Sequence, residues 1–171
     1  MKSKKSKTQS RSKSKSGKRA VHRTAKPASA AHAAVTAPPA GGPQIGLEGI
    51  AERVVELAHT IQAVNPQLPP VLSTPMMIGL MEHATVKAIT PGLPPGAISV
   101  GTRIEVDHLK AVGPGATVVA WAKFIEYRGR FLVFDVEARS GDHLIGRGRV
   151  FRAIVQPREH GEKAAARVVR K

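Results

Sequence analysis

Residues 71–92 read VLSTPMMIGLMEHATVKAITPG, and this stretch decides the fold. Ser73 or Thr74 can cap the N-terminus of a helix, Pro75 suits its first position, and the Pro-Gly pair at 91–92 ends it. Apolar residues occupy more than one face of this helix, so we expect other structure to wrap around it. The sequence therefore predicts a central, largely buried helix.

Downstream of the helix, the pattern changes from helical to alternating. Segment 98–108, ISVGTRIEVDH, alternates apolar and charged residues, which is typical of a half-buried strand. Its apolar face is predicted to consist of Val100, Ile104, Val106 and His108. Three further strands, at 116–127, 131–139 and 143–155, follow after short turns. Four consecutive strands predict an antiparallel meander, so the fold class is α+β, with a sheet curled around the helix.

The segment upstream of the helix is ambiguous. Ile50, Val54, Leu57 and Ile61 fall at helical spacing, which favours a helix over about 50–63. The alternative is a strand at 51–57 followed by a short helical turn at 59–65. Periodicity alone leaves both readings open.

The charge of the chain is concentrated at its beginning. Residues 1–45 hold eleven Lys or Arg and no Asp or Glu, which is +11 of the total +15. We therefore expect a disordered basic tail at 1–45, a domain at 46–156 and a charged tail at 157–171. A polycationic tail can contact nucleic acid through its phosphates, and the plain alternative is that it only aids solubility.

Several classes of protein are excluded or disfavoured by composition. The chain has no cysteine, which excludes disulfides, a thiol nucleophile and thiolate metal sites. No metal or cofactor is expected, because P-loop, dinucleotide-binding and zinc-hydrolase motifs are absent from the sequence. No apolar run approaches the roughly 20 residues of a membrane span, and no secretory signal is evident. We expect a soluble, cytoplasmic protein.

Three residues are candidates for chemistry. Glu82 has no cation three or four positions away in its helix, and a buried carboxylate without a partner suits a general base or an acyl-accepting nucleophile. The plain alternatives are that it faces solvent or pairs with a distant Arg or His. His108 ends an apolar strand face and could transfer a proton to or from a substrate oxygen. A satisfied core histidine is the alternative, and His83 is a second candidate.

Thr74 is the third candidate, although its role as a helix cap would explain it fully. If the helix begins there, Glu82 lies about 12 Å further along the axis, at about 1.5 Å per residue. One helix cannot bring these two side chains together, so a second subunit or a chain reversal would have to do it. Several strand arginines could also meet a nucleotide phosphate, but outward strand arginines are usually only solvated; these are Arg128, Arg130, Arg147, Arg149 and Arg152.

The segments LSTPMMIGLMEHA (72–84), GTRIEVDHLKAVGPG (101–115) and YRGR (127–130) resemble the hotdog-fold thioesterases related to fluoroacetyl-CoA thioesterase. The similarity covers roughly 47–155. In that family a threonine, a glutamate eight residues later and a histidine 26 residues further form the catalytic set. Thr74, Glu82 and His108 reproduce both intervals, and Gly101 matches a glycine seven residues before the histidine.

The resemblance implies a hotdog fold, a strand rather than a helix at 50–57, and a homodimer or dimer of dimers with active sites at the dimer interface. It implies hydrolysis of an acyl-CoA thioester, with Glu82 as base or nucleophile, assisted by His108 and Thr74. Gly101 and, as a weaker correspondence, Arg152 are implied to contact the substrate.

This chain also departs from the family pattern. The segment NPQLPPV (65–71) lacks the phenylalanine lid of the fluoroacetyl-selective member. Pro75 stands in place of a glycine and His83 in place of a tryptophan, so selectivity for fluoroacetyl-CoA is not expected. The alternative function is a non-catalytic acyl-CoA-binding hotdog regulator whose basic tail contacts nucleic acid, although no helix-turn-helix is evident.

Overall fold

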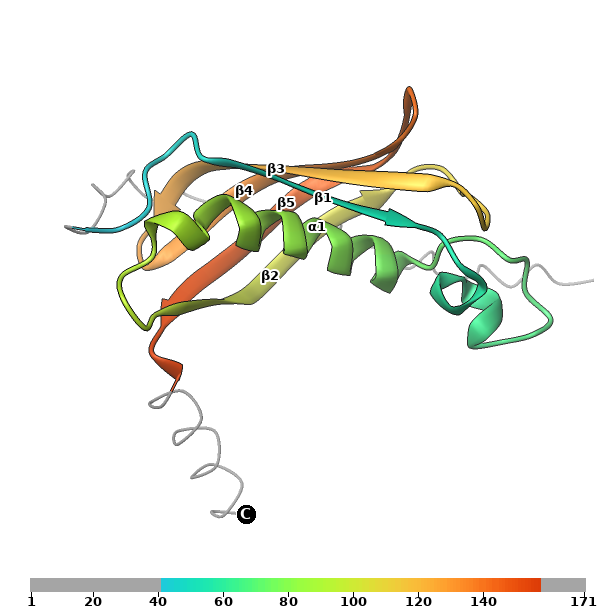
Figure 1. Ribbon diagram of the computed structural model, residues 1–171, viewed down its shortest axis with the longest axis horizontal. Helices are drawn as coiled ribbons and strands as arrows, with labels where there is room; N and C mark the ends of the chain where they lie inside the picture. Colours follow the sequence, from blue (N-terminus) through green and yellow to red (C-terminus); the bar gives the residue numbers. More distant parts are fainter. Residues whose placement is uncertain (1–40, 158–171) are drawn as a thin grey trace, which may run out of the picture. The chain divides into compact units, whose positions relative to one another are not determined.

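One long helix lies across one face of a five-stranded antiparallel sheet (Figure 1). The computed structural model describes residues 41–157; the two predicted tails therefore lie outside the described residues, apart from 41–45 and Pro157. The elements are β1 (Glu48–Val54), the 3-10 turns η1 (Leu57–His59) and η2 (Ile61–Ala63), α1 (Thr74–Ile89), η3 (Thr90–Gly92), β2 (Ile98–His108), β3 (Thr117–Arg128), β4 (Phe131–Ser140) and β5 (His143–Val155). No helix in this part of the chain is long and apolar enough to cross a membrane.

The sheet has the strand order β1-β3-β4-β5-β2. The four strands predicted after the helix are confirmed, but the prediction that all four form one meander is wrong. Only β3, β4 and β5 follow one another, whereas β2 pairs with β5 and lies at the edge. Its connection to β3 runs over 109–116, which is longer than a tight hairpin and allows the chain to pass to the far side of the meander.

The first strand resolves the ambiguity upstream of the helix. Segment 48–54 pairs with β3, so the helical reading is wrong and the strand reading is confirmed. The four apolar residues at helical spacing all lie exposed instead of forming a core face; these are Ile50, Val54, Leu57 and Ile61. The inward face of β1 carries Gly49 and Ala51, and a Cβ at Gly49 would overlap the backbone of α1. Helix and strand therefore pack backbone to backbone.

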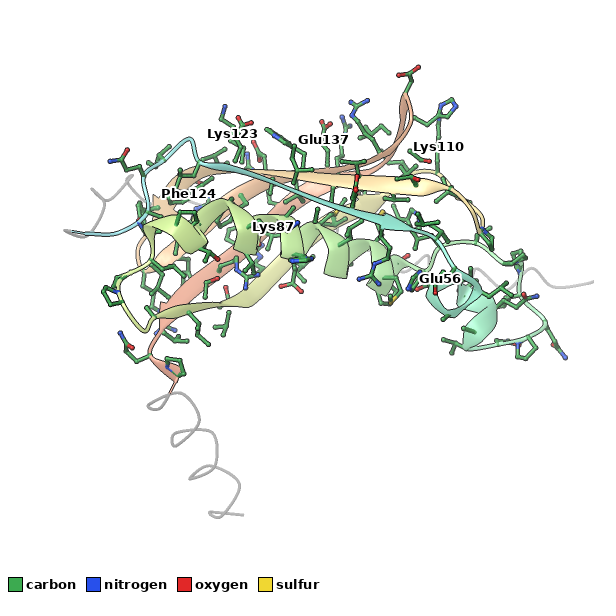
Figure 2. All side chains as sticks on the ribbon, in the orientation of Figure 1. Glu56, Lys87, Lys110, Lys123, Phe124 and Glu137 are labelled. Carbon is green, nitrogen blue, oxygen red and sulfur yellow. The ribbon has the colours of Figure 1, made fainter. Side chains whose placement is uncertain are left out.

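Helix α1 is buried on one side only. Its inward face packs on Phe124 and other core residues of the sheet (Figure 2), whereas Gly79, His83 and Lys87 form an exposed row. The predicted fold class, an antiparallel sheet around a central helix, is confirmed, and beyond its first turn the sheet leaves only this row of the helix exposed. The predicted end is close to the observed one, since α1 stops at Ile89 and η3 contains the Pro-Gly pair.

Strand β2 contains a bulge between Gly101 and Arg103. A bulge adds one residue to one strand, so side-chain alternation is reversed across it. Gly101 faces α1 on one side of the bulge, and Val106 packs on the core on the other. The prediction that Val100 shares a face with Val106 is therefore wrong.

Candidate active site

Thr74 and His108 meet where the start of α1 lies against the end of β2. The Thr74 Oγ1 atom lies 2.9 Å from His108 Nδ1, and His108 Nε2 lies 3.1 Å from the main-chain oxygen of Lys110. Because a carbonyl oxygen only accepts, Nε2 carries the proton and the Nδ1 of a neutral ring accepts from the Thr74 hydroxyl. The two contacts hold the imidazole ring in one orientation.

This arrangement changes the interpretation of Thr74. Ser73, not Thr74, occupies the capping position of α1, and its side chain makes no capping hydrogen bond. Thr74 is the first helical residue, so Pro75 is second rather than first. The Thr74 hydroxyl is therefore free of the capping role and is directed to His108.

An open hollow adjoins the Thr74–His108 pair. Its volume is about 290 Å³, and both side chains line it together with Val71, Leu72 and the segment that follows β2. Thr74 is exposed and His108 is half-buried, so a molecule in the hollow can reach both polar groups. His83, the second histidine candidate, lies on the exposed row of α1 and does not line this hollow.

Glu82 belongs to a second cluster further along α1. Its Oε1 lies 3.4 Å from Nη1 of Arg152, and its side chain is 32% exposed. Of the two readings, the carboxylate without a partner is therefore wrong, and the alternative of a pair with a distant arginine is confirmed. The pairing was not apparent from the helix because the cation comes from β5, 70 residues away in sequence.

Arg152 is held tightly beneath Glu82. Its Nε donates to Ser99 Oγ at 3.0 Å and its Nη2 donates to the Ser99 carbonyl oxygen at 2.9 Å. The side chain is only 5% exposed. Burial lowers the pKa of Arg152, and the nearby Glu82 charge partly offsets this effect. Arginine remains protonated at neutral pH, so a fixed positive charge lies under the Glu82 carboxylate.

Gly101 completes the second cluster. It is opposite Arg152 in the β2–β5 ladder, and a Cβ at this position would overlap Oε1 of Glu82. The missing side chain allows the Glu82 carboxylate to lie against the backbone of the strand. Gly101 is itself exposed, so the carboxylate and the strand backbone are accessible from the same side.

The five predicted site residues therefore form two groups within one chain. Thr74 is next to His108, whereas Glu82, Gly101 and Arg152 lie together elsewhere on the same face. Eight helical positions separate the two groups on α1, which corresponds to about 12 Å. A single chain does not bring the two groups into contact.

Two groups that position the candidate site residues could not be predicted from the sequence. Ser99 orients Arg152, but a serine in a strand has no distinctive pattern. The Lys110 group that fixes His108 is a main-chain carbonyl, which any residue could supply. Among the described residues, no group of three or more His, Asp and Glu side chains is placed to hold a metal ion.

Comparison with known proteins identifies relatives of this chain. The family model for fluoroacetyl-CoA-specific thioesterases matches residues 55–158. The fluoroacetyl-CoA thioesterase of Streptantibioticus cattleyicolor is 37% identical over 136 residues, which covers 76% of this chain and 95% of the relative.

Solved structures agree with the sequence comparison. A structure of the fluoroacetyl-CoA thioesterase FlK has a TM-score of 0.67 at 34% identity, covering 73% of this chain and 97% of that one. A hot-dog-like protein from Thermanaerovibrio acidaminovorans has a TM-score of 0.66 at 22% identity, covering 72% and 91%. The second likeness bears on the fold alone. Together they confirm the predicted hotdog fold.

Proposed function

The chain belongs to the fluoroacetyl-CoA-specific thioesterase family and is a thioester hydrolase, and from this premise we propose that it hydrolyses small or medium acyl-CoA thioesters with Glu82, His108 and Thr74 as catalytic residues. The observation that carries the proposal is the Glu82 carboxylate, accessible against Gly101 and held over the buried cation of Arg152. A carboxylate that is accessible from solvent and fixed in place by an ion pair is suited to act on water as a base or on a thioester as a nucleophile.

The active site requires two subunits in this proposal. Within residues 41–157, strand β2 has no partner on its outer edge, and its apolar residues Ile98 and Ile104 are 44% and 40% exposed. An open edge of this kind pairs readily with a second strand. Antiparallel pairing of two β2 strands about Glu105, with Thr102 bulged out of the ladder, would put His108 opposite Gly101 of the partner subunit. The Thr74–His108 pair of one protomer would then face the Glu82 cluster of the other.

Two routes are compatible with this arrangement. In the first, Glu82 takes a proton from water, the resulting hydroxide attacks the thioester carbon, and the carbon–sulfur bond breaks. In the second, a Glu82 oxygen attacks the carbon itself, CoA leaves, and water hydrolyses the resulting anhydride. In both, the neutral His108 ring first takes up a proton from solvent and then delivers it to the leaving sulfur, while Thr74 holds the ring.

The acyl group is proposed to be aliphatic rather than fluoroacetyl. All six aromatic residues of the chain lie at or after Trp121, so none stands in the segment that precedes α1. That segment instead carries Leu57, Ile61 and Val64, which are exposed by 61%, 38% and 86%. These side chains are suited to cover a short alkyl chain by apolar contact.

The direct test is release of free CoA from a panel of acetyl- to octanoyl-CoA, with fluoroacetyl-CoA included. Wild type is compared with Glu82→Ala and His108→Ala. We expect turnover of aliphatic substrates by wild type and a large loss in both variants. Equal rates in all three proteins would refute the site, and tight binding without turnover would favour the non-catalytic regulator.

Mixing the two inactive variants tests the shared site. If each site takes His108 from one protomer and Glu82 from the other, a hybrid dimer carries one doubly altered and one intact site. Random exchange of equal amounts should then restore about a quarter of wild-type activity. A site contained in one subunit gives no recovery, because both sites of the hybrid would carry one change.

The basic tail predicted at 1–45 is proposed to be dispensable for hydrolysis. The described fold reaches back to Pro43, whose carbonyl oxygen accepts a hydrogen bond of 2.8 Å from the buried Tyr127 hydroxyl. A chain starting at Gly41 should therefore keep the thioesterase rate and lose any salt-sensitive binding to nucleic acid. Loss of hydrolysis on this truncation would contradict the separation of roles.

A further inference from the structure

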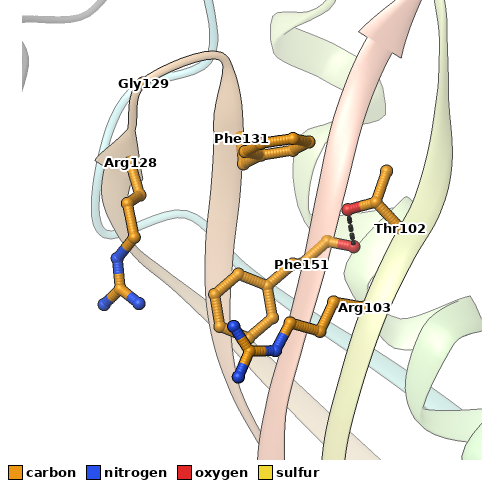
Figure 3. Close-up of a pocket in the computed structure, with 6 residues that line it drawn as sticks. All are labelled: Thr102, Arg103, Arg128, Gly129, Phe131 and Phe151. Carbon is orange, nitrogen blue, oxygen red and sulfur yellow. Dashed lines mark hydrogen bonds between the residues drawn. The ribbon is translucent and has the colours of Figure 1, made fainter. Parts of the chain in front are cut away.

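A second hollow lies on the outer face of the sheet, away from α1. Its volume is about 500 Å³, and it is lined by Thr102, Arg103, Arg128, Gly129, Phe131 and Phe151. Figure 3 shows the two phenylalanine rings facing the hollow from β4 and β5, with an arginine from β2 and one from β3 beside them. The lining is mostly apolar carbon with cations at the rim.

Arginine side chains stack on the two phenylalanine rings of this hollow. The guanidinium carbons of Arg103 and Arg128 lie 5.2 and 5.5 Å from the centre of the Phe151 ring. Arg130, from the turn between β3 and β4, lies 5.0 Å from the Phe131 ring. Stacking on an aromatic ring restrains a guanidinium and keeps its planar edge available for other partners.

These cations retain unused hydrogen-bond donors. Arg103 pairs with Glu105 and Arg128 with Glu126, each through Nη2. A guanidinium has five N–H donors, so each can still bind an oxyanion in the two-pronged manner typical of phosphate recognition. The side chains are 63% and 38% exposed, so a ligand from solvent can reach both.

The hollow is adjacent to the candidate active site across the sheet. Thr102 and Phe151 line the hollow, while their chain neighbours Gly101 and Arg152 face Glu82 on the other side. The two faces meet at the β2 edge, beside the bulge. In the proposed dimer the edge from Gly101 to His108 is paired, so a long, flexible substrate would have to pass around the start of β2, before Gly101, to reach both sites at once.

We propose that this hollow binds the 3'-phosphorylated ADP end of the CoA substrate, with the base on the half-buried Phe131 ring and the phosphates on Arg103, Arg128 and Arg130. The identity of the ligand rests on the proposed thioesterase function. The chemistry of the site, an aromatic floor with an arginine rim, also suits a free adenine nucleotide.

Binding of adenosine 3',5'-bisphosphate and of ADP to the full chain provides the first test. Arg103→Gln and Arg128→Gln should each weaken binding about tenfold, which is the effect of losing one charge-assisted contact. Arg149→Gln is the matched control, since Arg149 lies on the same face, pairs with Asp135 and does not line the hollow. Absence of binding to wild type at millimolar ligand, or equal losses in all three variants, would overturn the inference.

Kinetics distinguish the two sources of nucleotide. If the ligand is the substrate's own nucleotide, Arg128→Gln raises KM for acyl-CoA about tenfold and leaves hydrolysis of the matching acyl-pantetheine unchanged. If the natural ligand is instead a free nucleotide, adenosine 3',5'-bisphosphate and CoA bind without competing. The hollow is then a nucleotide site, but the inference that it binds the CoA substrate is overturned. A chain that binds the bisphosphate through these arginines but cleaves no thioester would refute the proposed function and not this site.

Discussion

The two groups of site residues differ in how the fold supports them. The Glu82 cluster is anchored in the interior, because Arg152 is buried and Ser99 holds it from two directions. The Thr74–His108 pair lies at an open hollow, and one hydrogen bond and one main-chain contact position it. The single chain thus builds one half of the site rigidly and presents the other half at its surface. Substitutions should affect the two halves differently.

Glu82→Gln should have the largest effect on activity. The amide can neither take a proton nor attack the thioester, so we expect kcat to fall about a thousandfold, within the range of general-base and nucleophile losses. Thermal unfolding should change much less, because glutamine retains the shape and an acceptor for Arg152. Steady-state CoA release and a melting curve test both parts, and unchanged kcat would remove Glu82 from the mechanism.

Gly101→Ala tests whether the interior cluster depends on the missing side chain. The added Cβ overlaps the end of the Glu82 side chain, which can swing away, so we expect about a hundredfold loss of kcat with a similar melting temperature. Gly79→Ala is the matched control, because nothing lies within 4 Å of a Cβ there. Full activity in Gly101→Ala would show that the carboxylate need not lie against the strand.

Thr74→Val and Thr74→Ser test the exposed pair. Valine removes the hydroxyl that meets His108 Nδ1, and we expect about a tenfold loss of kcat/KM, consistent with one hydrogen bond to a catalytic group. Serine keeps the hydroxyl and should remain within a few-fold of wild type. If serine loses activity and valine keeps it, the methyl group and not the hydroxyl is what matters at this position.

Ser99→Ala should have the smallest effect. It removes the bond from Arg152 Nε but keeps the one to the main-chain oxygen, so we expect a loss of about threefold in kcat. A change much larger than this would mean that Arg152 orientation, rather than its charge, limits catalysis.

The fold could be predicted from sequence where patterns are local. The alternation of β2 to β5 and the Pro-Gly end of α1 gave the elements close to their observed bounds. The exception was β1, where Ile50 and Val54 matched a helical period and yet lie exposed on a strand. There the resemblance to the family was correct and the periodicity was not, because apolar spacing predicts a helix only when those residues form the buried face.

The site could be predicted only in part. The candidate residues Thr74, Glu82 and His108 were found by their intervals, and they remain predictions until activity is measured. Their partners were not predictable from local spacing, since 34 residues separate Thr74 from His108 and 70 separate Glu82 from Arg152. Such contacts depend on sheet order, and the order was the part of the topology that the pattern misassigned.

The bulge in β2 explains why the number of residues between Gly101 and His108 has to be kept. Gly101 and His108 are an odd number of positions apart, so a regular strand would direct them to opposite faces. The extra residue at the bulge reverses the alternation once and allows both to face α1. Thr102 therefore acts as a spacer, and deleting it should detach His108 from Thr74 or Gly101 from Glu82 while every motif residue is kept. In a search for related chains, the length of this segment is as informative as its residues.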